Sequence, residues 1–173
     1  MIEEFWLYID SLINDVPLHI YVLLFCLFIV GTFVIIIKKG SCALSTSSLL
    51  LCVEYTFLIY CSTVIFREEK LSRTYNYIPF WSYERPDLLV ENVMNVVVFI
   101  PVGFLLGCTF KNINWRRIVL IGGCLSLSIE LFQLIIKRGL SELDDVMHNS
   151  IGCLIGYAFY SLINYEYEKH YKS

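Results

Sequence analysis

Five long apolar segments, separated by short polar links, dominate the pattern of hydrophobic and polar positions along the chain. A helix needs about 20 apolar residues to cross the hydrocarbon core of a bilayer. The segments lie near residues 18–37, 43–66, 88–108, 118–136 and 142–163. Because backbone groups in lipid must be hydrogen-bonded within the protein, helices are the structure expected for such runs. The pattern therefore predicts an all-α, polytopic membrane protein that forms a single domain over residues 1–173.

A shorter amphipathic pattern precedes the first segment, over residues 1–17. Its apolar residues recur at helical spacing, and its acidic residues occupy the other faces up to Pro17. This pattern is typical of a helix that lies in the membrane interface; a frayed terminus is the alternative. The N-terminus is acidic where a signal peptide would be basic. We therefore expect the first apolar segment to remain in the mature protein as an anchor.

The composition supports a membrane protein and excludes several other classes. Of the 173 residues, 57% are hydrophobic and 17% are charged, and the mean hydropathy is +0.66. A soluble domain is nearer one quarter charged, and a net charge of −3 provides no basic surface for nucleic acid. Six of the seven cysteines lie in apolar stretches without C-x-x-C spacing. They are expected to be packing residues, and neither a metal nor another cofactor is expected.

The distribution of basic residues predicts the orientation in the cell membrane. One side carries Lys38, Lys39, Lys111, Arg116, Arg117, Lys169 and Lys172. Basic residues on the other side are mixed with many acids, so the positive-inside rule places the N-terminus outside and the C-terminus in the cytoplasm. In either orientation two segments separate the loop 67–87 from the link 137–145. These two stretches are therefore predicted to lie on the same side.

Polar stripes mark the three C-terminal segments near this shared side. They consist of Glu91, Asn92 and Asn95; of Ser126, Glu130 and Gln133; and of Asp145, Asn149, Gly152 and Gly156. An acidic side chain at the bilayer centre costs about 2.5–3.5 kcal/mol and usually marks function. The stripes are therefore expected to face one another around a polar cleft. Hydrogen bonding between helices without chemistry remains the alternative for Glu130 and Gln133, and Glu54, inside the second segment, has no evident partner.

The loop 67–87 combines aromatic residues with arginines. Aromatic rings favour the level of the lipid headgroups, and arginine suits phosphate and carboxylate groups. We expect the loop to fold back over the cleft and to contact an anionic headgroup, although an ordinary aromatic belt explains the rings equally well. The expected ligand-binding residues are Arg67, Arg73, Asn92, Asn95, Glu130, Gln133, Arg138, Asp145 and Asn149.

Several residues near the expected site have structural interpretations. Ser141 and Asp144 match a capping box at the start of the last helix, which makes Asp144 a cap. Gly152 and Gly156 form a G-x-x-x-G pattern, which usually indicates close helix packing. His148 resembles a metal ligand only superficially, and it is expected to be a lone histidine near a helix end.

Four blocks of sequence resemble the VanZ-like family. They are Asn76-Tyr-Ile-Pro79-Phe80, Asn95-Val-Val-Val-Phe99-Ile-Pro101-Val-Gly103, Ser126-Leu-Ser-Ile-Glu130-Leu-Phe-Gln133, and Arg138 followed by Asp144-Asp145-Val-Met-His-Asn149-Ser-Ile-Gly152. In order, they cover about residues 67–160. The chain departs from common members around Ser141 and Glu142, where an aspartate-rich stretch is frequent. The resemblance implies a bacterial integral membrane protein, and the founding member of the family is associated with teicoplanin resistance.

Three functions remain open at this point. The first is a non-catalytic envelope protein that binds a lipid-linked or anionic ligand, with membrane lipids, a lipid-linked cell-wall precursor or a lipoglycopeptide as partner. The second is an intramembrane enzyme with Glu130 or Asp145 as general base, which ranks lower because no activated nucleophile accompanies them. The third is a small transporter, against which the lack of an internal repeat argues unless the chain forms a homo-oligomer.

Overall fold

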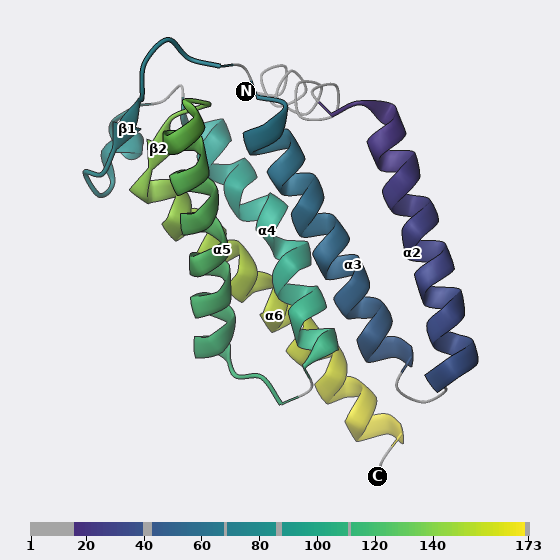
Figure 1. The fold of residues 1–173 in the computed structure, drawn as a ribbon. Coiled ribbons are helices and arrows are strands. Elements are labelled where there is room, and N and C mark those ends of the chain that lie inside the picture. The colour runs from purple at the N-terminus through teal and green to yellow at the C-terminus, as the bar shows by residue number, and fades with distance from the viewer. Residues whose placement is uncertain (1–15, 40–42, 68, 86–87, 111, 172–173) are drawn as a thin grey trace.

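Five long helices run back and forth in a computed structural model that describes residues 16–39, 43–67, 69–85, 88–110 and 112–171. They are α2 (Leu18–Lys39), α3 (Ala43–Tyr60), α4 (Leu89–Thr109), α5 (Trp115–Ile136) and α6 (Leu143–Tyr171). Consecutive helices point in opposite directions, so their connections alternate between the two ends of the bundle (Figure 1). Four helical stretches, at 44–65, 89–109, 115–136 and 143–170, are long and apolar enough to cross a membrane.

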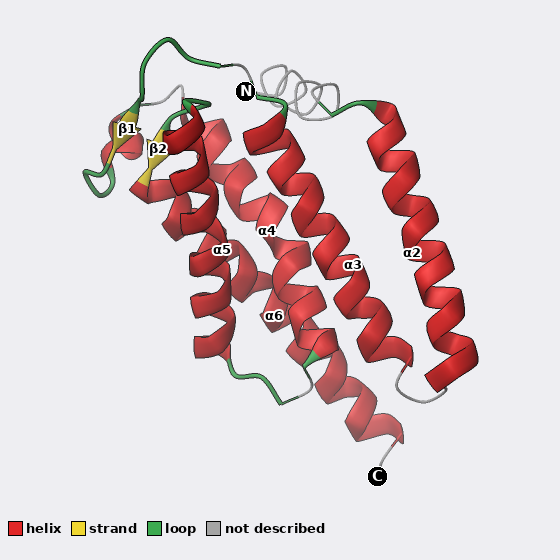
Figure 2. Ribbon diagram, in the orientation of Figure 1, coloured by secondary structure: helices red, strands yellow, loops and turns green. Residues whose placement is uncertain are grey.

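The all-α, polytopic architecture predicted from the sequence is confirmed. Helix and loop account for nearly all of the described chain, and two very short strands lie together at one end of the bundle (Figure 2). Helix α2 is also apolar and packs against α3. The interfacial helix expected over residues 1–17 lies outside the described residues, apart from Val16 and Pro17.

Local structure explains where α5 begins and where α3 ends. The side chain of Asn114 accepts a hydrogen bond from the backbone N–H of Arg117 at 3.0 Å, which caps α5 and starts it at Trp115, before the expected residue 118. Helix α3 continues as a π-helical turn over Cys61–Ile65. The second membrane segment therefore extends to the loop that follows it.

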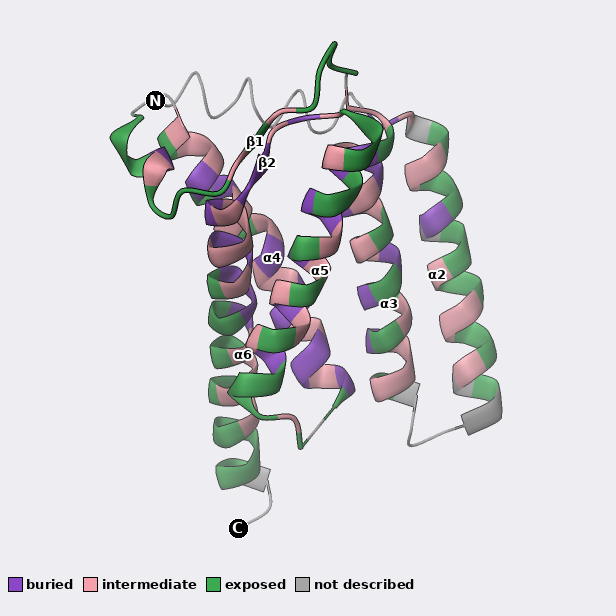
Figure 3. Ribbon diagram, turned by 60° about the vertical axis from the view of Figure 1, so that its left-hand side comes forward, coloured by how far each residue is buried: buried purple, intermediate pink, exposed green. Residues whose placement is uncertain are grey.

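The glycines of α4 and α6 allow these two helices to pack backbone against backbone. A Cβ atom added at Gly156 would lie 1.9 Å from the Ile100 carbonyl oxygen, and one at Gly103 would lie 1.9 Å from that of Cys153. The G-x-x-x-G pattern therefore serves close packing. Buried residues face the interior of the bundle, while α2 exposes much of its surface (Figure 3). The apolar core comprises Cys52, Ile59, Val64, Phe99, Val102, Leu106, Ile118, Ile129 and Cys153.

The loop after α3 is joined to the link between α5 and α6 by backbone pairing. Strand β1 (Tyr75–Asn76) runs parallel to β2 (Ser141–Glu142). The Thr74 hydroxyl donates to the Gly139 carbonyl at 2.7 Å. Both stretches lie at the same end of the bundle (Figure 1), which confirms that they share a side.

The capping box expected at Ser141 and Asp144 does not form. Ser141 belongs to strand β2, and its backbone N–H donates to the Thr74 carbonyl at 3.1 Å. Asp144 turns its carboxylate to the loop 67–87 and not to the first turn of α6. The loop presents two backbone N–H groups at this point, and donating to Asp144 satisfies its fully buried carboxylate.

Candidate ligand-binding site

The polar faces of α4, α5 and α6 meet near the end of the bundle that carries the strands. The Asn95 amide donates to Asp145 Oδ1 at 2.7 Å, which joins α4 to α6. The Asn149 amide donates to Ser126 Oγ at 2.7 Å, which joins α6 to α5. These four residues form the polar layer of the bundle. Because they bond to one another, the layer fixes the relative positions of the three helices.

A short segment of the loop covers this end of the bundle. It runs over Phe80–Glu84, includes a 3-10 turn (Trp81–Glu84), and is called the roof segment below. Asp144 accepts hydrogen bonds from the backbone N–H groups of Phe80, at 2.7 Å, and Ser82, at 3.0 Å, and from the Ser82 hydroxyl at 2.6 Å. The loop therefore does fold back over the helices, and a carboxylate of α6 fixes it there.

Two further contacts attach the roof segment. The Asn92 amide donates to Ser82 Oγ at 3.2 Å. The Tyr83 hydroxyl and His148 Nε2 are 2.8 Å apart. Asn92, expected to bind ligand, and His148 thus both hold the roof segment in the structure.

A groove of about 300 Å³ opens beside the polar layer, between α5, the start of α6 and the strands. It is lined by Tyr77, Leu127, Glu130, Leu131, Ser141, Glu142, Leu143 and Val146. We call it the Glu130–Glu142 groove. Its polar end holds two carboxylates and two hydroxyls, whereas Leu127 and Leu131 are about half exposed on the outer face of α5. This combination suits an amphiphilic molecule that approaches from the membrane.

The two carboxylates of the groove are linked through the backbone. Glu130 Oε2 accepts a hydrogen bond from the backbone N–H of Glu142 at 2.8 Å, and the side chains of Glu130 and Glu142 are 4% and 5% exposed. Glu142 Oε1 is buried and has no hydrogen-bond partner. An unpaired buried acceptor is uncommon in native proteins and calls for an explanation. Here a buried acceptor without a partner belongs to a residue that lines the groove.

Negative charge predominates around the groove. Burial, together with the nearby carboxylates of Glu91 and Asp144, raises the pKa of Glu142 to about 6. The Trp81 indole and the Arg67 guanidinium act in the opposite direction, although the indole N–H falls short of hydrogen-bond geometry. At neutral pH Glu142 is therefore mainly ionised. Within the described ranges, no three His, Cys, Asp or Glu side chains are placed to hold a metal ion.

The three arginines expected at the cleft have different environments. Arg67 is half-buried, and its charge acts on Glu130, Glu142 and Asp145. Arg138 donates a hydrogen bond to the Ile65 carbonyl, which ties the link to the end of the second segment. Arg73 is exposed, and among the described residues no hydrogen bond or ion pair joins it to this cluster.

Three residues that line the groove, Tyr77, Ser141 and Glu142, were not among the expected ligand-binding residues. Ser141 was expected in a capping box, and Tyr77 in the loop that folds back over the cleft. The pairing of β1 with β2 brings these residues together. Strands of two residues are too short to produce a recognisable alternation of polar and apolar residues in the sequence. Gln133, by contrast, was expected here, but its amide donates to the Thr63 carbonyl at 3.0 Å and ties α5 to the end of α3.

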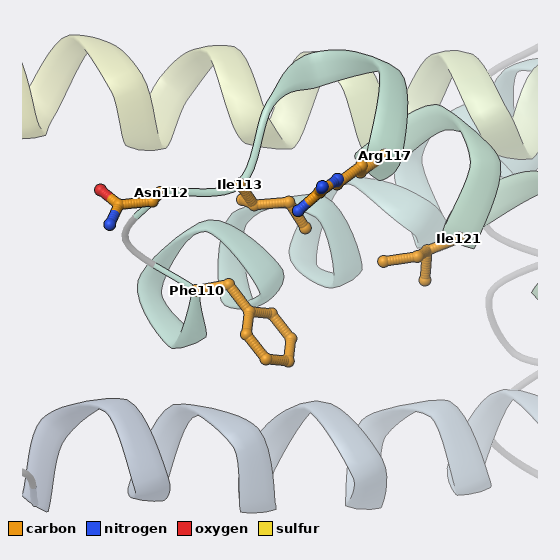
Figure 4. Close-up of a pocket in the computed structure, with 5 residues that line it drawn as sticks. All are labelled: Phe110, Asn112, Ile113, Arg117 and Ile121. Atoms are coloured by element: carbon orange, nitrogen blue, oxygen red, sulfur yellow. The ribbon is translucent and has the colours of Figure 1, made fainter.

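Other cavities lie apart from this groove. Glu54 is buried and lines an apolar pocket of about 330 Å³ between α2 and α3. A cavity of about 500 Å³ lies where α4 connects to α5, at the opposite end of the bundle from the strands (Figure 1). Phe110, Ile113 and Ile121 form its apolar wall, and Arg117 is its charged lining residue (Figure 4). It shares no residue with the groove.

The fold and the site together define a multi-pass, all-α membrane protein with a buried polar site at one end of its bundle. The chain belongs to the VanZ/LLP1 family, whose model matches residues 18–164. It is similar to Protein VanZ of Enterococcus faecium, with 36% identity over 74 residues. That similarity covers 43% of this chain and 46% of the relative, so it spans about half the length of either protein. No solved structure matches the chain.

Proposed function

We propose that this protein binds a lipid-linked molecule of the bacterial cell envelope in the Glu130–Glu142 groove, without catalysis, and thereby lowers susceptibility to the lipoglycopeptide teicoplanin. The observation that carries the proposal is the groove itself. It has buried carboxylates at one end and membrane-exposed leucines along its side. Its volume of about 300 Å³ lies at the lower end of the range for ligand sites. The link to teicoplanin rests on family membership.

The surrounding contacts favour binding over catalysis. Asp145 is engaged by Asn95, and Glu130 by the backbone N–H of Glu142. Among the described residues, no serine or cysteine is hydrogen-bonded to a histidine, and His148 instead meets Tyr83. An activated nucleophile normally requires such a base. The candidate general bases Glu130 and Asp145 are therefore better suited to hold polar groups in place.

We further propose that the groove faces the exterior of the cell. The opposite end of the bundle from β1 and β2 carries Lys38 and Lys39 at the end of α2, Arg116 and Arg117 at the start of α5, and the last turn of α6 (Figure 1). Basic residues favour the cytoplasmic side. Cysteines introduced one at a time at Leu71 and Asn112, which are both exposed, test this in a chain whose seven native cysteines are replaced by alanine. A membrane-impermeant maleimide should label Leu71→Cys in intact cells and Asn112→Cys only after lysis. The reverse pattern would invert the orientation.

The resistance role is tested by expression in a sensitive bacterial host. The wild-type protein should raise the inhibitory concentration of teicoplanin more than that of vancomycin. Leu131→Trp, which fills the groove, should remove this effect. Leu120→Trp is the matched control, because Leu120 is 66% exposed on the same helix and does not line the groove.

Equal amounts of the three proteins in the membrane, checked by immunoblot, are required for the comparison. Unchanged susceptibility to both antibiotics on wild-type expression would refute the resistance role. Full protection by Leu131→Trp would refute the role of the groove.

A further inference from the structure

We infer that the chemical group bound at the polar end of the Glu130–Glu142 groove is a primary ammonium carried by an amphiphile, and not a phosphate or carboxylate. This inference rests on the proposed function, because it names the class of ligand that the same groove takes. It departs from the anionic headgroup expected from the arginines in the sequence.

The hydrogen-bonding groups of the groove are mainly acceptors. Glu130 and Glu142 are both at least 95% buried. Glu142 Oε1 is unpartnered, and Glu130 Oε2 already holds the backbone N–H of Glu142. The other polar lining groups are the hydroxyls of Ser141 and Tyr77, which are 3.3 Å apart. An ammonium group brings three donors and no acceptor, so it matches this lining.

The charges around the groove favour the same ligand. Glu91 and Asp144 act on Glu142, and Asp145 interacts with both Glu130 and Glu142. Arg67 is the cation that acts on this group of carboxylates. A phosphate would therefore meet an excess of negative charge at close range in a partly desolvated site, where like charges repel strongly. An ammonium would instead donate to the carboxyl groups of Glu130 and Glu142 and compensate the charge of Glu142.

The position of Arg67 explains why it does not convert the groove into an anion site. Its guanidinium packs on Gly139, where an added Cβ would lie 3.1 Å from Nη1. Gly139 has φ of +80°, a conformation that favours glycine. Arg67 does not line the groove. It therefore moderates the negative charge from the side and leaves the carboxylates available to a donor.

An amphiphile also fits the remaining walls. Leu127, Leu131 and Val146 extend from the polar end along α5 and α6. An alkyl chain lying on these residues gains about 0.8 kcal/mol for each methylene group removed from water. The amine is either the headgroup of an aminophospholipid or a free amino group on a lipid-linked precursor, and these two sources are separated below.

Three amphiphiles with the same chain length test the inference: dodecylammonium, dodecyl phosphate and dodecyl maltoside. The full chain, with Trp6→Phe and Trp115→Phe, is placed in phosphatidylcholine nanodiscs. Binding is followed through the fluorescence of Trp81, whose indole lies near Glu142. Dodecylammonium should bind at least about tenfold more tightly than dodecyl phosphate, since hydrogen bonds to charged groups contribute about 1.5–3 kcal/mol each.

The variants identify the carboxylates that hold the amine. Glu142→Gln and Glu130→Gln should each weaken dodecylammonium binding by about tenfold or more. Glu84→Gln is the matched control, because Glu84 is exposed on the roof segment and lies outside the groove lining. It should leave binding unchanged. Equal loss in the control variant would contradict the assignment to the groove.

The outcomes separate this inference from the proposed function. Dodecyl phosphate binding as tightly as dodecylammonium would overturn the inference while leaving a groove that binds amphiphiles. No binding of any of the three probes would overturn the proposed function as well. Competition by phosphatidylethanolamine would identify an aminophospholipid, and competition only by a lipid-linked precursor with a free side-chain amine would identify that precursor. Competition by neither source would contradict the inference.

Discussion

Replacing Glu142 by glutamine should stabilise the protein at neutral pH while it weakens ligand binding. Glu142 is 5% exposed, and its pKa is raised to about 6 from an ordinary value of 4.5, mainly by burial. Ionised Glu142 is therefore less favourable in the folded protein than in the unfolded chain. Glutamine has nearly the same shape and removes the charge. The substitution thus relieves a burial penalty that the native residue carries.

The magnitude follows from the shift in pKa. A shift of one pKa unit corresponds to about 1.36 kcal/mol, so the difference between 4.5 and about 6 corresponds to about 2 kcal/mol. Because the folded protein holds the proton more tightly, the contribution of Glu142 to stability is fully present below about pH 4.5. It is lost as the pH rises through about 6 and is constant above that value. Glu142→Gln should therefore exceed the wild type by about 2 kcal/mol near pH 7.5, and match it near pH 4.

The assay is unfolding of the purified protein in detergent at a series of pH values. By the usual scaling for a chain of this length, about 2 kcal/mol corresponds to roughly 4–8 °C in Tm. The Glu84→Gln protein reports any general effect of removing one acidic group. A Glu142→Gln protein that is less stable than the wild type near pH 7.5 would refute the reasoning. So would a gain that is equally large near pH 4.

Three further substitutions test other parts of the site. Gly156→Ala should destabilise the protein by about 1–3 kcal/mol or more in the same assay, because its Cβ would meet a backbone carbonyl of α4 at 1.9 Å; Gly123→Ala, which meets only a flexible side chain at 3.3 Å, should have little effect. Asp144→Asn should destabilise by about 2–4 kcal/mol and expose the roof segment to limited proteolysis, since it weakens three hydrogen bonds to a buried carboxylate; an unchanged cleavage pattern would contradict this role. Arg67→Gln should raise the pH midpoint of the Glu142-dependent stability difference, because the guanidinium lowers the pKa of Glu142; a midpoint that falls would exclude that interaction.

The sequence predicted the bundle because the bilayer imposes a strong and simple constraint. Each apolar segment must form a helix, and an acid or amide inside a segment must face other helices. The pairing of Asn95 with Asp145 and of Asn149 with Ser126 is the expected result. The family membership inferred from four blocks of residues is confirmed over residues 18–164. These predictions rest on the helical periodicity of polar and apolar residues, which is visible in a single sequence.

The extramembrane end was harder to predict because contacts distant in sequence determine it. Asp144 satisfies the capping-box spacing, yet donors from Phe80 and Ser82, more than sixty residues away, compete for its carboxylate and prevail. Likewise, the sequence suggested an anionic ligand because the arginines lie in the loop 67–87 and the link 137–145, next to the expected site. Within the described part of the loop and the link, Arg67 acts on the carboxylates, whereas Arg138 is engaged by a backbone carbonyl. Spacing along the chain does not show which of several possible donors forms the hydrogen bond to a given acceptor in the folded protein.

Under the proposed function, stability and ligand binding impose opposite requirements on Glu142. A protein selected only for stability would place a neutral residue at this buried position, since the charge costs about 2 kcal/mol above pH 6. In the polar layer, Asn95 pairs with Asp145 and Asn149 pairs with Ser126, although Asn149 Oδ1 is buried without a hydrogen-bond partner. Unfavourable groups that persist in a fold are typical of functional sites, where activity is gained at the expense of stability. Under the proposed function, the groove beside the polar layer binds the ligand, and the polar layer holds the groove in shape.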